Sequence, residues 1–318
     1  MTTVASVHTI SPLSISPLSP TIGAEIWGLD LRHPLPDSVI ASLRAALVEW
    51  KVLFFRDQPL TTDQHLDFAR RFGPLEKHPF APAKPDFPEV LAITHDGDSP
   101  GYENTWHSDV TWRLEPSLGS ILLNVECPPV GGDTLFANME AAYDGLPEHV
   151  QDRIDGLVAM HDFESFRRRL RARGATPEQL DAFDAQYPNA FHPVVRTHPE
   201  TGRRSIYVND AFTKHIVDLD PAESAELLSM LYRQAAIPEY QCRFRWEQFS
   251  IAFWDNRSSQ HYAVSDYFPS RRCAERVTIC GDTPYFDPTI PRTEPSDRYK
   301  GRVASARSAV AGAATGYR

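Results

Sequence analysis

Apolar residues recur at helical spacing in four segments of the chain. In the first of these, Val39, Leu43 and Leu47 fall on one face of a helix, and Asp37 is a candidate cap at its start. Asp220, which precedes a proline, is a candidate cap for the last. The pattern predicts helices over residues 37–50, 62–72, 140–155 and 221–236.

Short apolar runs bounded by glycine and proline predict strands in much of the remaining chain. Residues 51–56 (KVLFFR) are short and apolar enough for a buried strand, and 22–31 fits a strand pair interrupted by glycine. Apolar runs such as 120–125 (SILLNV) alternate with turns from residue 90 to about 138. Further strands are expected over 250–255 and 276–280.

The segment 167–186 differs from the rest because it is charged and polar. We expect an exposed helix or a lid over the sheets there, with Arg167, Arg168 and Arg169 on a solvated face. Helices at the front, and strands that dominate the middle and end, indicate an α+β fold rather than a doubly wound one. Neither GxGxxG nor a P-loop occurs, so the usual nucleotide-binding signals are missing.

Charge and composition narrow the range of partners. The 318 residues include 32 basic and 42 acidic ones, and the formal net charge of −10 disfavours nucleic acid. No apolar stretch reaches the roughly 18 to 20 residues of a membrane span, and no secretory signal is evident, so no membrane partner is expected. Four cysteines without a CxxC pair fit thiols in a reducing compartment, which favours a cytoplasmic protein.

The tetrapeptide 106–109 (WHSD) carries the clearest chemical signal. On an extended chain His107 and Asp109 point to the same face and offer a metal two adjacent ligands. A third ligand must come from elsewhere, and His261, just after an apolar run, is the best candidate. Two histidines and one carboxylate on one face of an octahedral metal are the arrangement of non-haem Fe(II) oxygenases. Zn²⁺ is the competing metal, and three protein ligands on it usually serve hydrolysis.

Five motifs follow one another along the chain: WHSDVT (106–111), GGDT (131–134), HPVVRTHP (192–199), WDNR (254–257) and RVT (276–278). Together with a spacing of eleven from His261 to Arg272, they resemble the taurine dioxygenase/TfdA family of Fe(II)- and 2-oxoglutarate-dependent dioxygenases. The resemblance implies a distorted double-stranded β-helix (jelly roll) core with helices outside. It also implies Fe(II), 2-oxoglutarate and O₂ as cofactor and cosubstrates, and a homo-oligomer, either dimer or tetramer.

The resemblance runs over residues 22–285, nearly the whole chain. It therefore implies one dioxygenase domain at 22–285, preceded by a proline-rich lead-in (1–21). The remaining tail (286–318) is rich in Pro, Ala, Gly, Ser and Arg, and we expect it to lie over the surface or to be partly disordered.

The resemblance assigns roles to individual residues. His107, Asp109 and His261 match the metal ligands. Arg272 matches the arginine that pairs with the far carboxylate of 2-oxoglutarate, a task that suits a guanidinium fork. Its neighbour Arg271 would face the opposite side of a strand. Thr134 matches the threonine that supports the same carboxylate.

Substrate contacts are implied in the same way. Arg276 matches the arginine that binds a sulfonate, and together with His78 it would supply the fixed positive charge that an anion needs near so acidic a protein. Phe166 and Phe212 match aromatic residues of that pocket. Glu103 and Ala81 replace an asparagine and a tyrosine of the taurine enzyme, which argues against taurine itself. Glu103 would contact a cation or point to solvent.

The resemblance implies hydroxylation of a small organic anion, with succinate and CO₂ as co-products. An alkyl sulfate ester or an alkanesulfonate is the first choice of substrate. Hydroxylation beside the ester oxygen or the sulfur gives a product that collapses to an aldehyde and sulfate or sulfite. Such an enzyme would serve sulfur metabolism. The same chemistry on a carboxylate, such as an aryloxyalkanoate or a secondary metabolite, is the alternative. A Zn²⁺ hydrolase and a non-catalytic binding protein are more remote alternatives.

Overall fold

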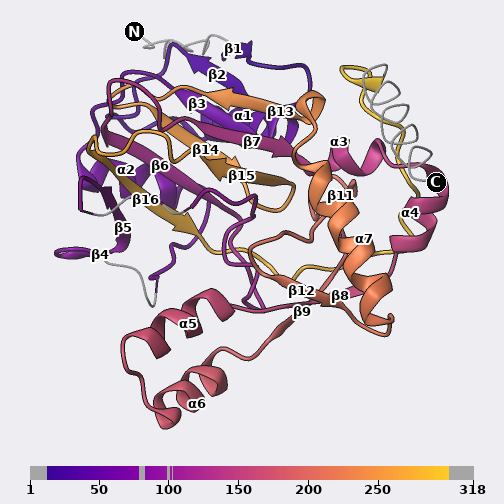
Figure 1. The fold of residues 1–318 in the computed structure, drawn as a ribbon. Coiled ribbons are helices and arrows are strands. Elements are labelled where there is room, and N and C mark those ends of the chain that lie inside the picture. The colour runs from indigo at the N-terminus through magenta and orange to yellow at the C-terminus, as the bar shows by residue number, and fades with distance from the viewer. Residues whose placement is uncertain (1–12, 79–82, 99–100, 102, 301–318) are drawn as a thin grey trace, which may run out of the picture.

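The computed structural model describes residues 13–78, 83–98, 101 and 103–300 (Figure 1). Within these residues sixteen strands form four sheets, and the largest has the order β1-β2-β3-β14-β6-β16-β5-β4. All pairings in it are antiparallel except that of β2 with β3. Its strands are β1 (Ser14–Pro17), β2 (Ala24–Trp27), β3 (Val52–Phe55), β4 (Ala83–Lys84), β5 (Phe87–His95), β6 (Gly119–Glu126), β14 (Ile251–Asp255) and β16 (Arg272–Ile279).

Three smaller antiparallel sheets complete the strand structure. The sheet β13-β7-β15 consists of Gln241–Phe244, Thr134–Asn138 and Ser259–Ala263; the sheet β12-β8-β9 of Thr213–Ile216, Val158–His161 and Ala190–Pro193; and the pair β10-β11 of Val195–Thr197 and Arg204–Ile206. The helices are α1 (Asp37–Trp50), α2 (Thr62–Arg70), α3 (Met139–Asp144), α4 (Glu148–Ile154), α5 (Glu164–Ala172), α6 (Pro177–Gln186), α7 (Pro221–Gln234) and a 3-10 turn at Pro238–Tyr240.

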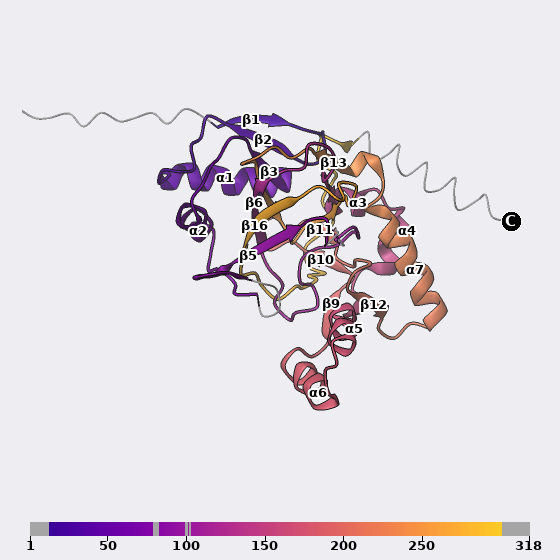
Figure 2. The ribbon, with the colours of Figure 1, turned by 60° about the vertical axis from the view of Figure 1, so that its left-hand side comes forward.

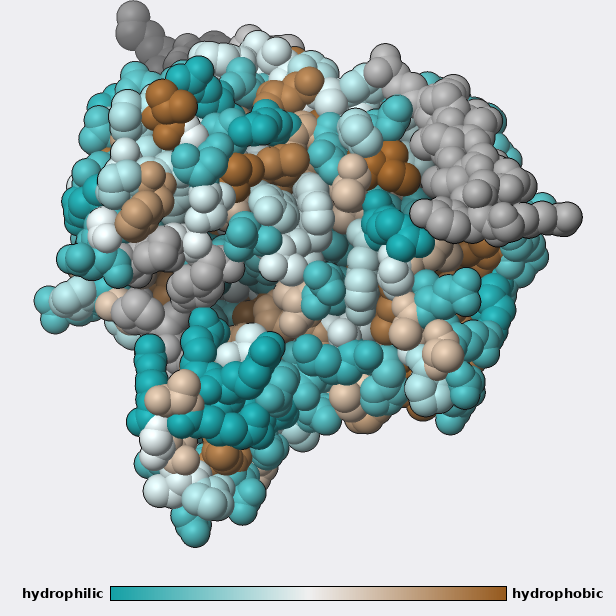
Figure 3. Space-filling model, in the orientation of Figure 1, coloured by the Kyte–Doolittle hydropathy of each residue, from teal (hydrophilic) through white to brown (hydrophobic). Residues whose placement is uncertain are grey.

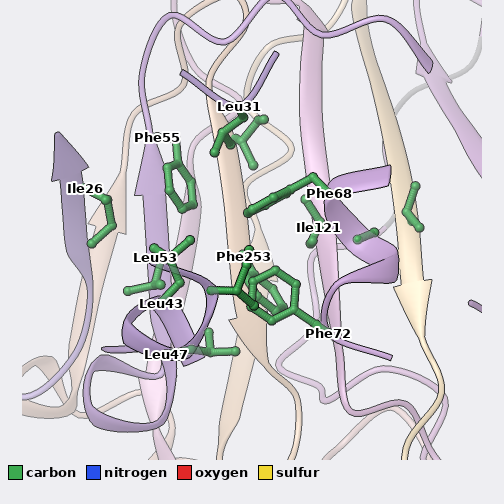
Figure 4. Close-up of a cluster of buried hydrophobic side chains, with 14 of the residues drawn as sticks. Ile26, Leu31, Leu43, Leu47, Leu53, Phe55, Phe68, Phe72, Ile121 and Phe253 are labelled. Carbon is green, nitrogen blue, oxygen red and sulfur yellow. The ribbon is translucent and has the colours of Figure 1, made fainter. Parts of the chain in front are cut away.

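Alternate residues of the large sheet belong to two different hydrophobic clusters, because successive side chains on a strand point to opposite faces. On one face Leu53, Phe55 and Phe253 pack against the apolar sides of α1 and α2, as Figure 4 shows for Leu43 and Phe68. This is why α1 has the bounds that its apolar spacing predicts. Asp37 is not its cap, however, because Pro36 occupies that position without a side-chain hydrogen bond.

The opposite face of the large sheet packs on the sheet β13-β7-β15. Phe54 of β3 stacks on Phe244 of β13, with ring centroids 3.9 Å apart, and contacts Phe136 of β7 edge to face. Leu122 and Trp254 belong to the same cluster. The two sheets thus form a sandwich, and their facing sides supply most of the side chains of the candidate site.

A third cluster joins α3, α4 and α7 to the two remaining sheets. The predicted helix over 140–155 is in fact two helices, since Gly145-Leu146-Pro147 separates α3 from α4. Asp220 caps α7 as expected, accepting a hydrogen bond from the backbone of Ala222. The predicted strand pair over 22–31 is also wrong in part: β2 is a single strand there, and its antiparallel partner β1 lies in the lead-in.

The segment 164–186 projects from the body of the molecule as an arm (Figures 1 and 2). It consists of two helices, α5 and α6, rather than one, and largely hydrophilic side chains cover it on the face in Figure 3. The expectation that all three arginines are solvated fails for Arg167. Its buried guanidinium binds Asp162 and Asp184, both at 2.5 Å, and so ties α5 to α6 and to the end of β8.

The tail runs back over the body as far as it is described. Tyr299 is buried, and its hydroxyl hydrogen-bonds to Asp144 at the end of α3. Across the residues that the structure describes, no helix combines the length and the apolarity required to cross a bilayer.

Candidate active site

His107, Asp109 and His261 meet beside β15, the edge strand of the sheet β13-β7-β15. His107 forms an isolated β-bridge with His261 of β15, and the two residues exchange backbone hydrogen bonds of 3.1 and 2.8 Å. Oδ1 of Asp109 lies 3.8 Å from Nε2 of His107 and 3.9 Å from Nε2 of His261. One ligand atom from each of the three residues lies within 4.8 Å of the others. The backbone bridge therefore brings together three side chains that are far apart in the sequence.

The protonation states of these groups suit a divalent metal, whose ligands must be neutral imidazoles and an ionised carboxylate. Nδ1 of His107 lies 2.7 Å from the carbonyl oxygen of Thr105. Because a carbonyl oxygen can only accept, Nδ1 carries the proton, and the lone pair of Nε2 is left to bind a metal. Burial, with help from His107, lowers the pKa of His261 to about 3. Burial opposes ionisation of Asp109, but Arg276 and the two histidines outweigh it and hold the pKa of this carboxyl well below its usual value.

The Asp109 carboxylate and backbone are both fixed by neighbouring side chains. Arg276 Nη1 donates to Oδ1 at 2.8 Å, and the Ser120 hydroxyl donates to Oδ2 at 3.2 Å. The side chain of Asn256 accepts from the Asp109 backbone N–H at 2.6 Å and donates to its carbonyl oxygen at 2.9 Å. Sequence reasoning found the motif that contains Asn256, but not this role. Two histidine nitrogens and one oriented carboxylate fit the facial set of a non-haem Fe(II) site.

A cavity extends from the metal-ligand cluster between the two sheets. Arg272 is only 6% exposed at its inner wall, and burial lowers the pKa of its guanidinium. The ring of Trp246 lies 5.7 Å from the guanidinium carbon, and the indole N–H donates to Thr134 Oγ1 at 2.9 Å. The cavity is lined by Ile93, Glu103, His107, Leu122, Thr134, Phe136, Trp246, Trp254, His261, Ala263, Arg272 and Arg276.

Arg272 makes no ion pair with any residue that the structure describes, and its Nε has no hydrogen-bond partner there. A buried cation of this kind is costly unless an anion joins it. Arg271, by contrast, is exposed and pairs with Glu126. The unpaired guanidinium and the Thr134 hydroxyl therefore fit the far carboxylate of 2-oxoglutarate. Trp246 belongs to none of the five motifs, so nothing in the sequence signalled its place here.

His78 and Arg276 line a second, smaller depression together with Glu76 and Thr278. Arg276 has a carboxylate partner already, Asp109, whereas Glu275 pairs with Lys84. The Nε of Arg276 is buried without a hydrogen-bond partner among the described residues. Burial, reinforced by Arg276 and Arg113, lowers the pKa of His78 to about 4. At neutral pH the His78 imidazole is therefore mostly uncharged, and the positive charge expected of this pair falls to Arg276.

Aromatic rings extend from the metal ligands toward the arm. Phe212 approaches the ring of His107 edge to face, with centroids 6.2 Å apart. Phe163 bridges Phe212 and Phe166, at 5.7 and 5.1 Å. Of the two expected phenylalanines, only Phe212 thus has a ring contact with a metal-ligand residue. Phe166 lies on α5, one ring farther away, and Phe163 was not foreseen because it belongs to no motif.

Glu103 lies in the cavity rather than away from it. Its Oε2 is 3.2 Å from Nε2 of His95 at the end of β5, and its side chain is 35% exposed. Ala81, the other departure from the taurine enzyme, lies outside the described residues.

Comparisons with known proteins agree with this geometry. The profile of the family described as "Taurine catabolism dioxygenase TauD, TfdA family" matches residues 14–278. A sulfate ester dioxygenase of Pseudomonas putida that depends on alpha-ketoglutarate is 37% identical over 86% of this chain and 91% of its own. An alpha-ketoglutarate-dependent 2,4-dichlorophenoxyacetate dioxygenase of Cupriavidus pinatubonensis is 33% identical, over 84% and 97%.

The fold is shared as well. The crystal structure of a taurine dioxygenase from Burkholderia xenovorans superposes with a TM-score of 0.75 and 38% identity, and the match covers 95% of this chain and 99% of that one. Family membership removes the hydrolase and the non-catalytic binding protein as alternatives. The chain belongs to the TauD/TfdA family and is a dioxygenase that depends on Fe(II) and 2-oxoglutarate.

Proposed function

We propose that the enzyme oxidises a small organic anion, most readily an alkyl sulfate ester or an alkanesulfonate. One observation carries the proposal: Arg276 stands beside Asp109 and keeps a buried Nε without a partner among the described residues. A guanidinium has five N–H groups, so it can hold Asp109 and an anion at the same time. The 37% identity to a sulfate ester dioxygenase supports the sulfate ester as the first choice.

The metal-ligand cluster would bind the metal, and the cavity would bind 2-oxoglutarate. His107, Asp109 and His261 would hold Fe(II), which, with 2-oxoglutarate and O₂, supplies the oxidation of a substrate C–H bond. Arg272 would form a guanidinium–carboxylate pair with the far carboxylate of 2-oxoglutarate, and Thr134 would support it by its hydroxyl. Trp246 donates to the oxygen of the Thr134 hydroxyl, which leaves the hydroxyl hydrogen available for the carboxylate.

Arg276 and the substrate-side residues would orient the reacting carbon. The anion takes the free donors of Arg276, and neutral His78 adds a hydrogen bond but no charge. Phe212 beside His107 gives the chain of the substrate an apolar surface close to the metal ligands. Such positioning brings one C–H bond to the reacting centre.

The product follows from the carbon that is hydroxylated. For a sulfate ester R–CH₂–O–SO₃⁻, hydroxylation of the carbon gives R–CH(OH)–O–SO₃⁻. Its C–O bond then breaks, the hydroxyl loses its proton, and an aldehyde and sulfate separate. For a sulfonate the C–S bond breaks in the same way and releases sulfite. Succinate and CO₂ form from 2-oxoglutarate in either case.

A second candidate substrate is an aryloxyalkanoate or another carboxylate. The 33% identity to the 2,4-dichlorophenoxyacetate dioxygenase supports this candidate. A carboxylate can also pair with Arg276 as well as a sulfonate can.

A substrate panel tests the proposal. Succinate is measured with Fe(II), O₂ and 2-oxoglutarate, in the presence of alkyl sulfates of several lengths, linear alkanesulfonates, taurine or an aryloxyacetate. We expect alkyl sulfates or long sulfonates to stimulate succinate formation, with one sulfate or sulfite released per succinate. Stimulation by the aryloxyacetate alone would establish the carboxylate alternative.

We further propose that the two packed sheets are the halves of a distorted double-stranded β-helix and that the enzyme is a cytoplasmic homo-oligomer. The packing of the sheet β13-β7-β15 on the large sheet supports the first point. The four cysteines, all of them free thiols, support the location. Sedimentation velocity would establish the number of subunits.

A further inference from the structure

The chain turns sharply directly after the metal ligand Asp109. Val110 is buried and has a φ of 50°, in the left-handed region that a β-branched residue rarely adopts. Such a conformation persists only where its surroundings hold it in place. Asn256 holds the Asp109 side of the turn through both backbone groups of that residue. The other side of the turn, at Thr111, needs a restraint of its own.

The Thr111 side chain is fully buried and is held from two directions. Asn209 Nδ2 donates to Thr111 Oγ1 at 3.0 Å, and Nδ1 of His161, on β8, lies 3.1 Å from the same oxygen. Asn209 and Thr111 are 98 residues apart in the chain. The far side of the strained turn is therefore attached to the sheet β12-β8-β9 through side chains.

The same Asn209 side chain also fixes Phe212, whose ring meets that of His107 edge to face. Asn209 Oδ1 accepts from the Phe212 backbone N–H at 3.0 Å. Because a backbone N–H can only donate, this contact identifies the oxygen end of the amide and leaves the nitrogen end for Thr111. Two further hydrogen bonds of 3.0 Å join the backbone of Asn209 to Thr213, so the turn that carries Phe212 is closed by Asn209.

We propose that Asn209 is a positioning residue that fixes the metal ligand Asp109 and the ring of Phe212 together, through one fully buried side chain. It acts on Asp109 through Thr111 and the strained Val110, and on Phe212 through the backbone. The orientation of a metal ligand and the place of an apolar surface beside the metal ligands then depend on a residue that contacts neither metal nor substrate. The part that concerns Phe212 rests on the proposed function, which makes this ring a substrate contact.

Calorimetric titration with Mn(II) measures the effect on Asp109 apart from turnover. Asn209→Leu and Thr111→Val should each raise the Kd of Mn(II) about tenfold, as loss of outer-shell support does. The double variant should bind no more than about threefold more weakly than either single one, because both changes break the same link. Ser224→Ala is the matched control: it removes a buried hydroxyl that accepts from the Ile216 N–H at the other end of β12, and it should leave the Kd unchanged.

Two results would overturn the role at Asp109: an unchanged Kd in Asn209→Leu, or losses that multiply to about 100-fold in the double variant. Should Asn209→Leu fail to fold, Thr111→Val tests the same link with a side chain of the same shape, and an unchanged Kd there would overturn it equally.

The role at Phe212 is read from the sulfate released per succinate, with hexyl sulfate as the probe. Asn209→Leu should lower this ratio at least about twofold, because a displaced ring no longer holds the substrate carbon at the reacting centre, whereas Ser224→Ala should keep it. An unchanged ratio in Asn209→Leu would refute this role. If hexyl sulfate fails to stimulate the wild type, the proposed substrate class is wrong, and the Mn(II) titrations still decide whether Asn209 positions Asp109.

Discussion

Arg276 donates a hydrogen bond of 2.8 Å to Oδ1 of Asp109, the oxygen that faces both metal-ligand histidines. The arginine expected to bind substrate is therefore in direct contact with a residue expected to bind metal, although the two lie 167 residues apart in the chain. The proposed anion site and the metal site therefore share one guanidinium.

The two arginines of β16 have different surroundings, Arg276 beside Asp109 and Arg272 beside Thr134 and Trp246 in the cavity, so we predict a different outcome for each. Arg276→Gln should raise KM for the anionic substrate about 10- to 100-fold, the effect of losing one charge-assisted interaction. It should leave the Kd of 2-oxoglutarate within about threefold. Arg272→Gln should do the reverse. Steady-state kinetics with varied substrate, together with 2-oxoglutarate titrations, would check both, and a loss of 2-oxoglutarate binding in Arg276→Gln would mean that the roles are exchanged.

The metal-ligand assignment predicts the loss of metal binding. Asp109→Ala should bind Mn(II) at least about 100-fold more weakly, because it removes an anionic ligand, and should show no 2-oxoglutarate turnover with Fe(II). A chelator should abolish turnover of the wild type, and added Fe(II) should restore it. Ser120→Ala, which removes the 3.2 Å hydrogen bond to Oδ2 and the 3.3 Å one to Thr278 but no metal ligand, is the control and should keep most of its metal affinity. Full turnover in Asp109→Ala would disprove the assignment.

The Asn256 side chain predicts an effect on metal through backbone positioning. Asn256 is fully buried and binds both the N–H and the carbonyl of Asp109, and it also donates to Ser117 Oγ at 3.1 Å. Asn256→Ala should weaken metal binding about 10- to 100-fold, as loss of outer-shell support does, and should cost about 1–3 kcal/mol of unfolding free energy. Ser117→Ala, which removes one partner of Asn256, should have a much smaller effect on Mn(II) affinity. Equal metal affinities in the two variants would contradict the positioning role.

Helices with a clear apolar stripe were predictable because their own residues determine them. The stripe of Val39, Leu43 and Leu47 gives α1 its observed bounds. The break between α3 and α4 was missed because their apolar pattern continues across Gly145-Leu146-Pro147, although the proline at 147 was a signal against one helix.

The site was predictable in its ligands and not in its supports. His107 and Asp109 are two residues apart, so local geometry suggested their convergence, and the place of His261 just after an apolar run made it the candidate third ligand. The contacts of Arg276 with Asp109 and of Trp246 with Thr134 depend on sheet packing between residues 167 and 112 positions apart. No local pattern in the sequence encodes such contacts. Arg167 shows the same limit. A run of three arginines predicts a solvated surface, and only the fold shows that Asp162 and Asp184 pair with Arg167.

Arg167 also predicts how the arm is held. Its side chain binds Asp162, Asp184 and Glu164, the last at 3.2 Å, so Arg167→Leu should loosen α5 and α6. Amide hydrogen exchange in 164–186 should become at least about tenfold faster, and KM should rise, because Phe163 and Phe166 stand at the base of this arm. Arg168→Leu is the matched control, since Arg168 is exposed, and its exchange should resemble the wild type. Unchanged exchange in Arg167→Leu would show that apolar packing alone holds the arm.

His65 predicts a dependence of stability on pH that is independent of the active site. It is fully buried on α2, with Nε2 3.1 Å from the carbonyl oxygen of Ile121, and burial lowers its pKa from 6.5 to about 4. As pH falls below 6.5 the unfolded chain takes up a proton at this residue while the folded protein does not until about pH 4. The contribution of His65 to the free energy of unfolding therefore falls as pH is lowered through this window, by about 2 kcal/mol between pH 7 and pH 5.

His65→Gln isolates this contribution, because glutamine keeps a donor near Ile121 but does not titrate. Urea unfolding of both proteins at pH 7 and pH 5 measures it. The stability of the wild type relative to His65→Gln should decrease by about 2 kcal/mol on going to pH 5. His161 and His192, whose pKa values burial also lowers, are present in both proteins and cancel in the comparison. A difference that stays constant with pH would mean that His65 can be protonated in the folded protein at little cost.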